Sequence, residues 1–154
     1  MSEQSTNLTI EDQINDGLSG DARKNALSFA AFLRANGFVP EVNNEHDGWN
    51  ILNGDKVIVF LKVIGEENVF AIVFNYYFDF DSDGPVDDDV KEFTWAHVVK
   101  CPNGCGGTTI CEMSQKHKTI FGREYQNVCV APLECFNLDS DELELAEKLM
   151  LMGW

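Results

Sequence analysis

Three short runs rich in β-branched and aromatic residues constrain the fold of this chain more than any other feature. They cover residues 49–52, 57–64 and 69–78, and brief connections containing Gly and Asn separate them. Connections of this length join antiparallel strands, whereas a parallel crossover requires about a dozen residues or more. The three runs therefore predict an antiparallel β-meander.

The middle run, residues 57–64, is apolar at every position except Lys62. Successive side chains of a strand point to opposite faces of the sheet. Both faces of this strand are therefore apolar, and we expect it to lie in the centre of the sheet, covered by helices.

A helix is predicted before the meander. From Asp21 onward, apolar residues recur at the three- and four-residue steps of an amphipathic helix. Ser19 or Asp21 can cap its start, and Asn36-Gly37 can supply a left-handed stop.

Two further helices are predicted after the meander. One covers about residues 88–99 and the other about residues 140–152, where Asp139 and Glu142 have the spacing of a capping box. Residues 101–118 have the composition of a loop. Helices combined with an antiparallel meander predict an α+β domain of two layers.

The length of 154 residues and the apolar content of 44% fit one domain with a substantial core. We expect residues 21–154 to form that domain. Residues 1–20 are mostly polar and predict an N-terminal arm, which forms either a short helix or a loose segment.

The charge disfavours two classes of partner. The formal net charge is −15, from 26 acidic and 11 basic side chains. A negative field of this size repels nucleic acids and anionic lipid surfaces, which proteins bind through Lys and Arg. We therefore expect no nucleic-acid partner and no membrane partner.

The ends and the cysteines predict a cytoplasmic protein. No apolar run reaches the roughly 18 residues of a membrane span, and residues 1–7 lack the basic start and apolar stretch of a signal peptide. Five cysteines without an export signal are typical of a reducing compartment, where disulfides are rare.

The cysteines also suggest zinc, the one cofactor that the sequence points to. Thiolates suit the tetrahedral zinc ion, and two close pairs of sulfur ligands can complete its shell. The spacing differs from the common zinc knuckle, because three residues rather than two separate the first pair. The predicted ligands are Cys101, Cys105, Cys111 and Cys129, with His97 and His117 as substitutes.

Two other interpretations of the cysteines stay open. Reduced cysteines are often buried as small apolar residues. A catalytic cysteine instead needs a depressed pKa, for which His97, His117 or Lys116 are candidate neighbours. No recognised protease or hydrolase motif accompanies them, so the sequence argues against an enzyme.

The latter part of the chain resembles a known group of proteins. The matching segments are residues 93–98 (FTWAHV) and 119–129 (TIFGREYQNVC), with the cysteines between them. They resemble small cysteine-bearing bacterial domains of the Firmicutes type, some of which are attached to helix-turn-helix regulators. The resemblance implies effector sensing but no established activity. Glu112-Met113 replaces the Pro-Gly that often follows the third cysteine in that group.

An acidic segment between the meander and the next helix resembles the start of a calcium loop. Asp79, Asp81, Asp83 and Gly84 have the expected spacing, but Val90 occupies the position of the bidentate Glu. The alternative is a solvated loop that follows an apolar strand.

The residues chosen as candidates for ligand binding combine a basic cluster with aromatic neighbours. The cluster could hold an anion or could form surface ion pairs, and the tryptophans and the histidine could equally be core residues. The candidates are Trp49, Trp95, His97, Lys116, Lys118 and Arg123.

These observations predict a non-enzymatic binding or sensing module for a small molecule or a protein partner. A zinc-stabilised structural or interaction domain is the alternative, and a thiol-dependent enzyme is the second alternative.

Overall fold

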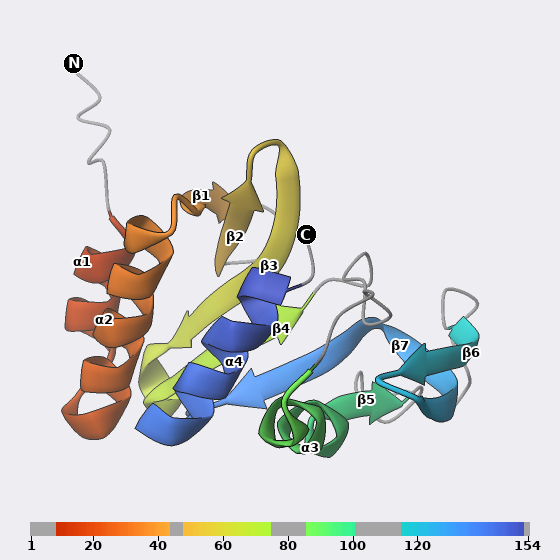
Figure 1. Ribbon diagram of the computed structural model, residues 1–154. Helices are drawn as coiled ribbons and strands as arrows, with labels where there is room; N and C mark the ends of the chain where they lie inside the picture. Colours follow the sequence, from red (N-terminus) through yellow and green to blue (C-terminus); the bar gives the residue numbers. More distant parts are fainter. Residues whose placement is uncertain (1–8, 44–47, 75–85, 101–114, 153–154) are drawn as a thin grey trace.

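The computed structural model describes residues 9–43, 48–74, 86–100 and 115–152. Within these ranges the chain forms four α-helices, one short 3₁₀ helix and seven strands, and every strand pair is antiparallel (Figure 1). The predicted α+β class is confirmed.

The strands form one sheet in the order β1-β2-β3-β4-β7-β5, and β6 pairs with β7. The predicted meander is present, because β2, β3 and β4 are neighbours along both the sequence and the sheet. The bounds are β1 Val39–Asn43, β2 Gly48–Asn53, β3 Lys56–Ile64, β4 Val69–Phe74, β5 Val98–Lys100, β6 Gln115–Ile120 and β7 Arg123–Phe136.

The helices cover one side of the sheet. Helix α1 contacts β3, α2 contacts β1 and β4, and α4 packs between α2 and α3 (Figure 1). Helices and sheet therefore form the two layers that the sequence predicts. The helical bounds are α1 Ile10–Gly17, α2 Gly20–Ala35, α3 Asp88–Ala96, α4 Ser140–Met152 and the 3₁₀ helix η1 Gly65–Glu67.

The core lies between these layers. Leu61 pairs with Ile72, which pairs in turn with Cys135, and all three side chains are fully buried. Phe29 of α2 packs edge-on against Phe70 of β4, with 5.8 Å between the ring centroids. Each such fully buried side chain contributes on the order of 1.5–3 kcal/mol of hydrophobic free energy.

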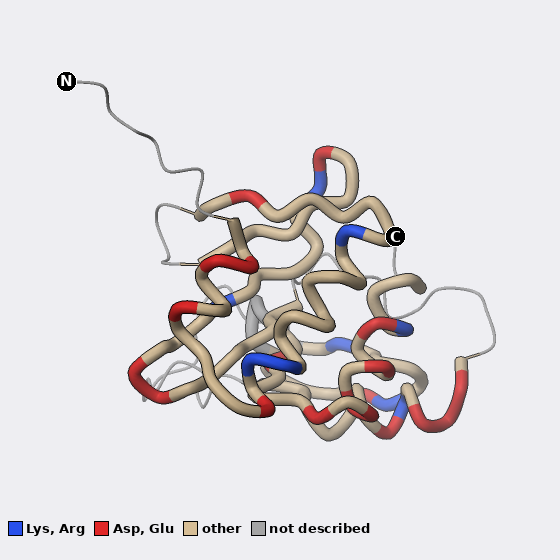
Figure 2. Tube along the Cα trace, turned by 90° about the vertical axis from the view of Figure 1, so that its left-hand side faces the viewer, with Lys and Arg blue, Asp and Glu red and all other residues tan. Residues whose placement is uncertain are grey.

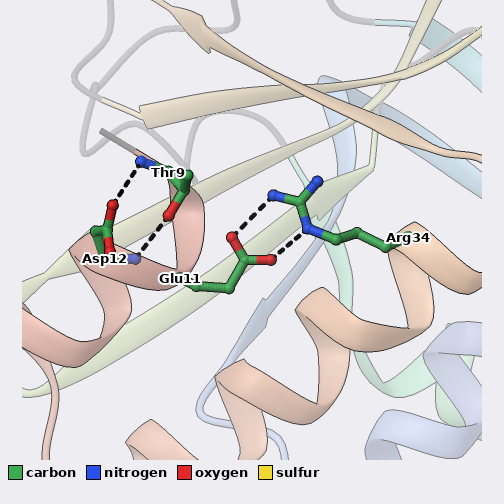
Figure 3. A network of polar contacts seen from close by, with 4 residues as sticks. All are labelled: Thr9, Glu11, Asp12 and Arg34. Atoms are coloured by element: carbon green, nitrogen blue, oxygen red, sulfur yellow. Dashed lines mark hydrogen bonds and ion pairs between the residues drawn. The ribbon is translucent and has the colours of Figure 1, made fainter. Parts of the chain in front are cut away.

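The described part of residues 1–20 contains a short helix that belongs to this core. The Oγ1 of Thr9 accepts the Asp12 N–H at 3.1 Å, and the Asp12 carboxylate accepts the Thr9 N–H at 3.1 Å (Figure 3). Ile10 and Ile14 are buried. The domain therefore includes α1 in its packing.

An ion pair ties α1 to α2. The Nη2 of Arg34 donates to Oε2 of Glu11 at 2.8 Å, and its Nε donates to Oε1 (Figure 3). This hydrogen bond from Arg34 lowers the pKa of the Glu11 carboxyl.

Two predicted helix ends agree with the structure: the C-terminal end of α2 and the start of α4. Asn36 caps the end of α2, and Gly37 adopts a left-handed φ of 76°. At the start of α4, Glu142 N–H donates to Oδ1 of Asp139 at 2.8 Å, and the Glu142 side chain accepts the Asp139 N–H at 3.4 Å. The predicted capping box is confirmed.

The structure corrects the sequence prediction for residues 97–99 and 115–118. Helix α3 ends at Ala96 rather than near residue 99, because Val98 pairs with Leu133 as part of β5. β-Branched valines fit a strand better than the end of a helix. Strand β6 also begins at Gln115, within the segment predicted to be a loop.

Candidate functional site

The candidate site lies where α3 meets the hairpin formed by β6 and β7. Ile120 pairs with Arg123, so only Phe121 and Gly122 form the turn between the strands. Their φ values are 48° and 83°, as in a type I′ turn. This turn matches the right-handed twist of the two strands and brings Arg123 next to the end of β6.

Trp95, near the end of α3, links that helix to the hairpin. Its indole N–H donates to the carbonyl oxygen of Ile120 at 2.7 Å. Trp95 is partly buried and packs against the core. The hydrogen bond therefore fixes the ring plane relative to the hairpin.

The guanidinium of Arg123 lies over that ring. Its Cζ is 4.0 Å from the centroid of the Trp95 ring, which is within the range of a cation–π contact. Arg123 itself is exposed. We call this pair the Trp95–Arg123 stack. The structure thus brings together two of the residues chosen from the sequence.

Lys118 lies on the same face of the hairpin as Arg123. Lys118 pairs with Tyr125, and Ile120 pairs with Arg123, so these four alternate residues share one side. Lys118 is partly buried. Lys116 belongs to β6 at the next alternate position, but its side chain lies outside the described residues.

The opposite face of the hairpin carries a different pair. The Nδ1 of His117 lies 3.3 Å from Oε1 of Glu124, and both side chains are largely exposed. Because side chains alternate along a strand, His117 and Glu124 face away from Lys118 and Arg123. Elsewhere on the described chain, acidic residues outnumber basic ones on most segments (Figure 2).

His97 caps the end of α3, two residues after Trp95. Its Nδ1 is 2.8 Å from the carbonyl oxygen of Phe93, and the two rings are 4.5 Å apart at their centroids. A carbonyl can only accept, so Nδ1 is the donor in this contact. The described contacts of His97 are made within α3 and to Glu134, whose N–H donates to the His97 carbonyl at 3.3 Å.

Trp49 lies apart from this site. It belongs to β2, is only 5% exposed, and its indole N–H donates to Oε1 of Gln13 in α1. The structure therefore places Trp49 in the core beneath α1, which was the alternative interpretation of this residue.

Most of the predicted zinc ligands lie outside the described residues. Cys101, Cys105 and Cys111 fall in residues 101–114, and Cys129 belongs to β7 although its side chain is not described. Within the part of the chain that the structure describes, no group of three His, Cys, Asp or Glu residues could hold a metal ion. The calcium-like segment from Asp79 to Gly84 is also outside the described ranges.

The backbone nevertheless brings the ends of the cysteine segment to one place. Lys100, the last residue of β5, and Gln115, the first residue of β6, both pair with Val128. The chain therefore leaves β5 and enters β6 on the two sides of Val128, and Cys129 is the next residue of β7. Sequence spacing alone could not predict this proximity.

Cys135 has a different environment. It is fully buried in the core, and burial raises the pKa of its thiol, with a further contribution from Glu142 and Glu134. A buried thiol with a raised pKa holds little thiolate near neutral pH and is therefore a poor nucleophile. Cys135 is therefore a core residue.

A cleft of about 600 Å³, which the sequence did not suggest, lies between the starts of α2 and α4. Some of its polar groups bond to one another: Asn25 Nδ2 donates to the Leu138 carbonyl at 3.2 Å, and Ser19 N–H donates to Asn68 Oδ1 at 2.9 Å. Asp21 also lines the cleft at the start of α2. These contacts join two helices and the η1–β4 connection.

No described helix has both the length and the apolar character that a membrane span requires. Comparisons with protein-family models, curated proteins and solved structures found no match to this chain. The resemblance to the cysteine-bearing bacterial domains therefore stays a prediction.

Proposed function

We propose that this protein is a non-enzymatic cytoplasmic binding module that holds an anionic group of a small molecule or protein partner on the basic face of the β6–β7 hairpin. The observation that carries the proposal is the 4.0 Å stack of Arg123 on Trp95, because the indole is itself fixed by its hydrogen bond to Ile120.

The stack suits anion binding for a physical reason. Stacking covers one face of the planar guanidinium and restricts its rotation. The N–H groups at its edge point outward in the plane of the group and stay available. These donors match the two oxygens of a carboxylate or a phosphate. Because the side chain is partly ordered before binding, less conformational entropy is lost when the anion arrives.

The acidity of the chain does not prevent this. Charges separated by more than the Debye length of about 8 Å at physiological salt are largely screened. The hairpin itself carries Arg123 and Lys118 on one face, whereas its Glu124 lies on the other face beside His117.

The test is a titration with citrate and with pyrophosphate, which represent carboxylate and phosphate ligands. We expect saturable shifts of the Trp95 Nε1–H and Arg123 Nε–H resonances in ¹H–¹⁵N spectra. Arg123→Ala should abolish binding, whereas Lys56→Ala should retain it. Lys56 is exposed at the start of β3 and controls for the loss of one positive charge. Identical shifts in both variants, or no saturable shift in the unmodified protein, would overturn the proposal.

A zinc-stabilised structural domain is a second candidate. It is supported by the pairing of Lys100 and Gln115 with Val128, which brings both ends of the segment containing Cys101, Cys105 and Cys111 beside Cys129. Ligands from distant parts of a chain must converge in this way to complete a tetrahedral site.

Metal content of protein purified under reducing conditions without chelator tests this second candidate. We expect about one zinc ion per chain, as in structural four-thiolate sites. Cys129→Ser should release the metal, and Cys135→Ala should retain it while lowering stability. Metal-free protein in which chelator leaves the melting temperature unchanged would exclude the zinc site.

A further inference from the structure

The turn of the β6–β7 hairpin has an unusual residue at its first position. Among the described residues, four non-glycine residues have positive φ, and three of them are Asn68, Asn127 and Asn137. The fourth is Phe121. Asparagine tolerates the left-handed region, but a bulky aromatic residue is rarely found there. A type I′ turn also favours Asn or Gly at this position.

The contacts of Phe121 offset this unfavourable conformation. Phe121 is partly buried and packs against the hydrophobic core. The preceding residue, Ile120, is fully buried and its carbonyl accepts the Trp95 indole N–H. The tip of the hairpin is thus held by the packing of Ile120 at the end of β6 and of Phe121 in the turn.

We infer that Phe121 is a positioning residue for the Trp95–Arg123 stack. Its ring anchors the tip of the hairpin on the core, and Arg123, two residues later, is thereby held over the indole. A turn residue chosen for backbone conformation alone would lack this anchor at the tip. The geometric part of this inference is independent of ligand binding, and its effect on affinity rests on the proposed function.

Three variants separate the effect of the Phe121 ring from the effect of the turn conformation. Phe121→Asn and Phe121→Gly remove the ring but suit the left-handed conformation, so the hairpin should still form. Phe121→Tyr keeps the ring and is the conservative control. If one of the first two variants does not fold, the other tests the same point.

The first readout is the ring-current shift of the Arg123 side-chain protons, measured without ligand. We expect upfield shifts in the unmodified protein and in Phe121→Tyr, and their loss in Phe121→Asn and Phe121→Gly. Retained upfield shifts in a folded ring-less variant would overturn the inference, whatever the binding data show.

The second readout is affinity for citrate or pyrophosphate. We expect a loss of roughly three- to tenfold in the ring-less variants, the size expected when one side chain must be ordered on binding. If the stack is lost in these variants but the unmodified protein binds neither probe, the positioning role holds and the proposed function fails. If the stack is lost and affinity is unchanged, the role of Phe121 in binding is overturned.

Discussion

The indole Nε1 of Trp95 and the carbonyl oxygen of Ile120 are 2.7 Å apart, and this hydrogen bond joins α3 to the end of β6, 25 residues later. Ile120 is fully buried, so water cannot readily reach its carbonyl oxygen and replace the indole as hydrogen-bond donor. An unsatisfied buried acceptor costs about 1–3 kcal/mol. The bond is therefore expected to contribute to stability as well as to the site.

Trp95→Phe removes this donor and weakens the contact with Arg123. We expect the free energy of unfolding to fall by about 1–3 kcal/mol, measured by urea denaturation. Trp49→Phe is the comparison, because Trp49 also donates one indole hydrogen bond, to Gln13. Both variants should be destabilised, but only Trp95→Phe should change the Arg123 resonances. An equal effect of both on Arg123 would contradict this assignment.

Asn137 connects β7 to the start of β4. Its Oδ1 accepts the Phe70 N–H at 2.8 Å, and its φ is 46°. Its Nδ2 also donates to the Asn68 carbonyl at 3.2 Å. Asn137→Ala loses both side-chain hydrogen bonds and the tolerance for this φ, and we expect a cost of about 2–4 kcal/mol.

Asn137→Gly separates the two effects. Glycine accepts the left-handed conformation but makes no side-chain hydrogen bond. Its free energy of unfolding should lie between those of the unmodified protein and the alanine variant. Equal stability of the two variants would mean that backbone conformation contributes nothing.

Gly48, the first residue of β2, has no room for a side chain. A Cβ there would lie 2.5 Å from Cζ of Phe60 and 2.7 Å from the Leu61 carbonyl oxygen. The second contact is with backbone, so relief requires the two strands to separate locally. We expect Gly48→Ala to destabilise the protein by about 1–3 kcal/mol or more.

Gly54→Ala is the matched control for this variant. Nothing lies within 4 Å of a Cβ at Gly54, but its φ is 66°. The alanine there should cost only about 1–2 kcal/mol, the penalty of the left-handed conformation. Chemical denaturation of both variants measures the difference, and a smaller loss at Gly48 would contradict the steric argument.

Glu134 lies on the side of the sheet opposite the core, in register with Val73 of β4. Burial raises the pKa of its carboxyl. A raised pKa in the folded state means that the ionised form opposes folding. This cost is present at pH values above the folded pKa and disappears below the ordinary value of 4.5.

Glu134→Gln should therefore raise the urea midpoint at pH 7 and give no gain near pH 4. Glu92→Gln, an exposed position on α3, removes the same charge and corrects for the general repulsion in this acidic chain. An equal gain for both variants at pH 7 would show that burial of Glu134 has no part in the effect.

The elements that were predicted from sequence are those with local signals. Helix α2 has a continuous apolar spacing and a glycine stop, and β2, β3 and β4 are dense in β-branched residues joined by short turns. Strand β1 was missed because five residues containing Pro40 and Glu41 give little strand signal.

Strands β6 and β7 give weak local signals for a related reason. The sequence of β6 is QKHKTI, and β7 contains Pro132 and the left-handed Asn127. Their stability comes from pairing with each other and with strands that are distant in sequence, which propensity does not detect. For the site, the basic residues could be identified by composition. The stack on Trp95 could not, because it depends on how α3 docks against the hairpin.

The partner of β4 has a consequence for synthesis of the chain. Phe74 pairs with Leu133, which the ribosome adds about 60 residues later. At roughly 5–20 residues per second, the nascent meander waits several seconds for β7, and β4 lacks that partner meanwhile. The unpaired edge of a strand can pair with strands of other chains. The exposed edge of β4 is therefore a site for aggregation of the newly made protein until β7 emerges.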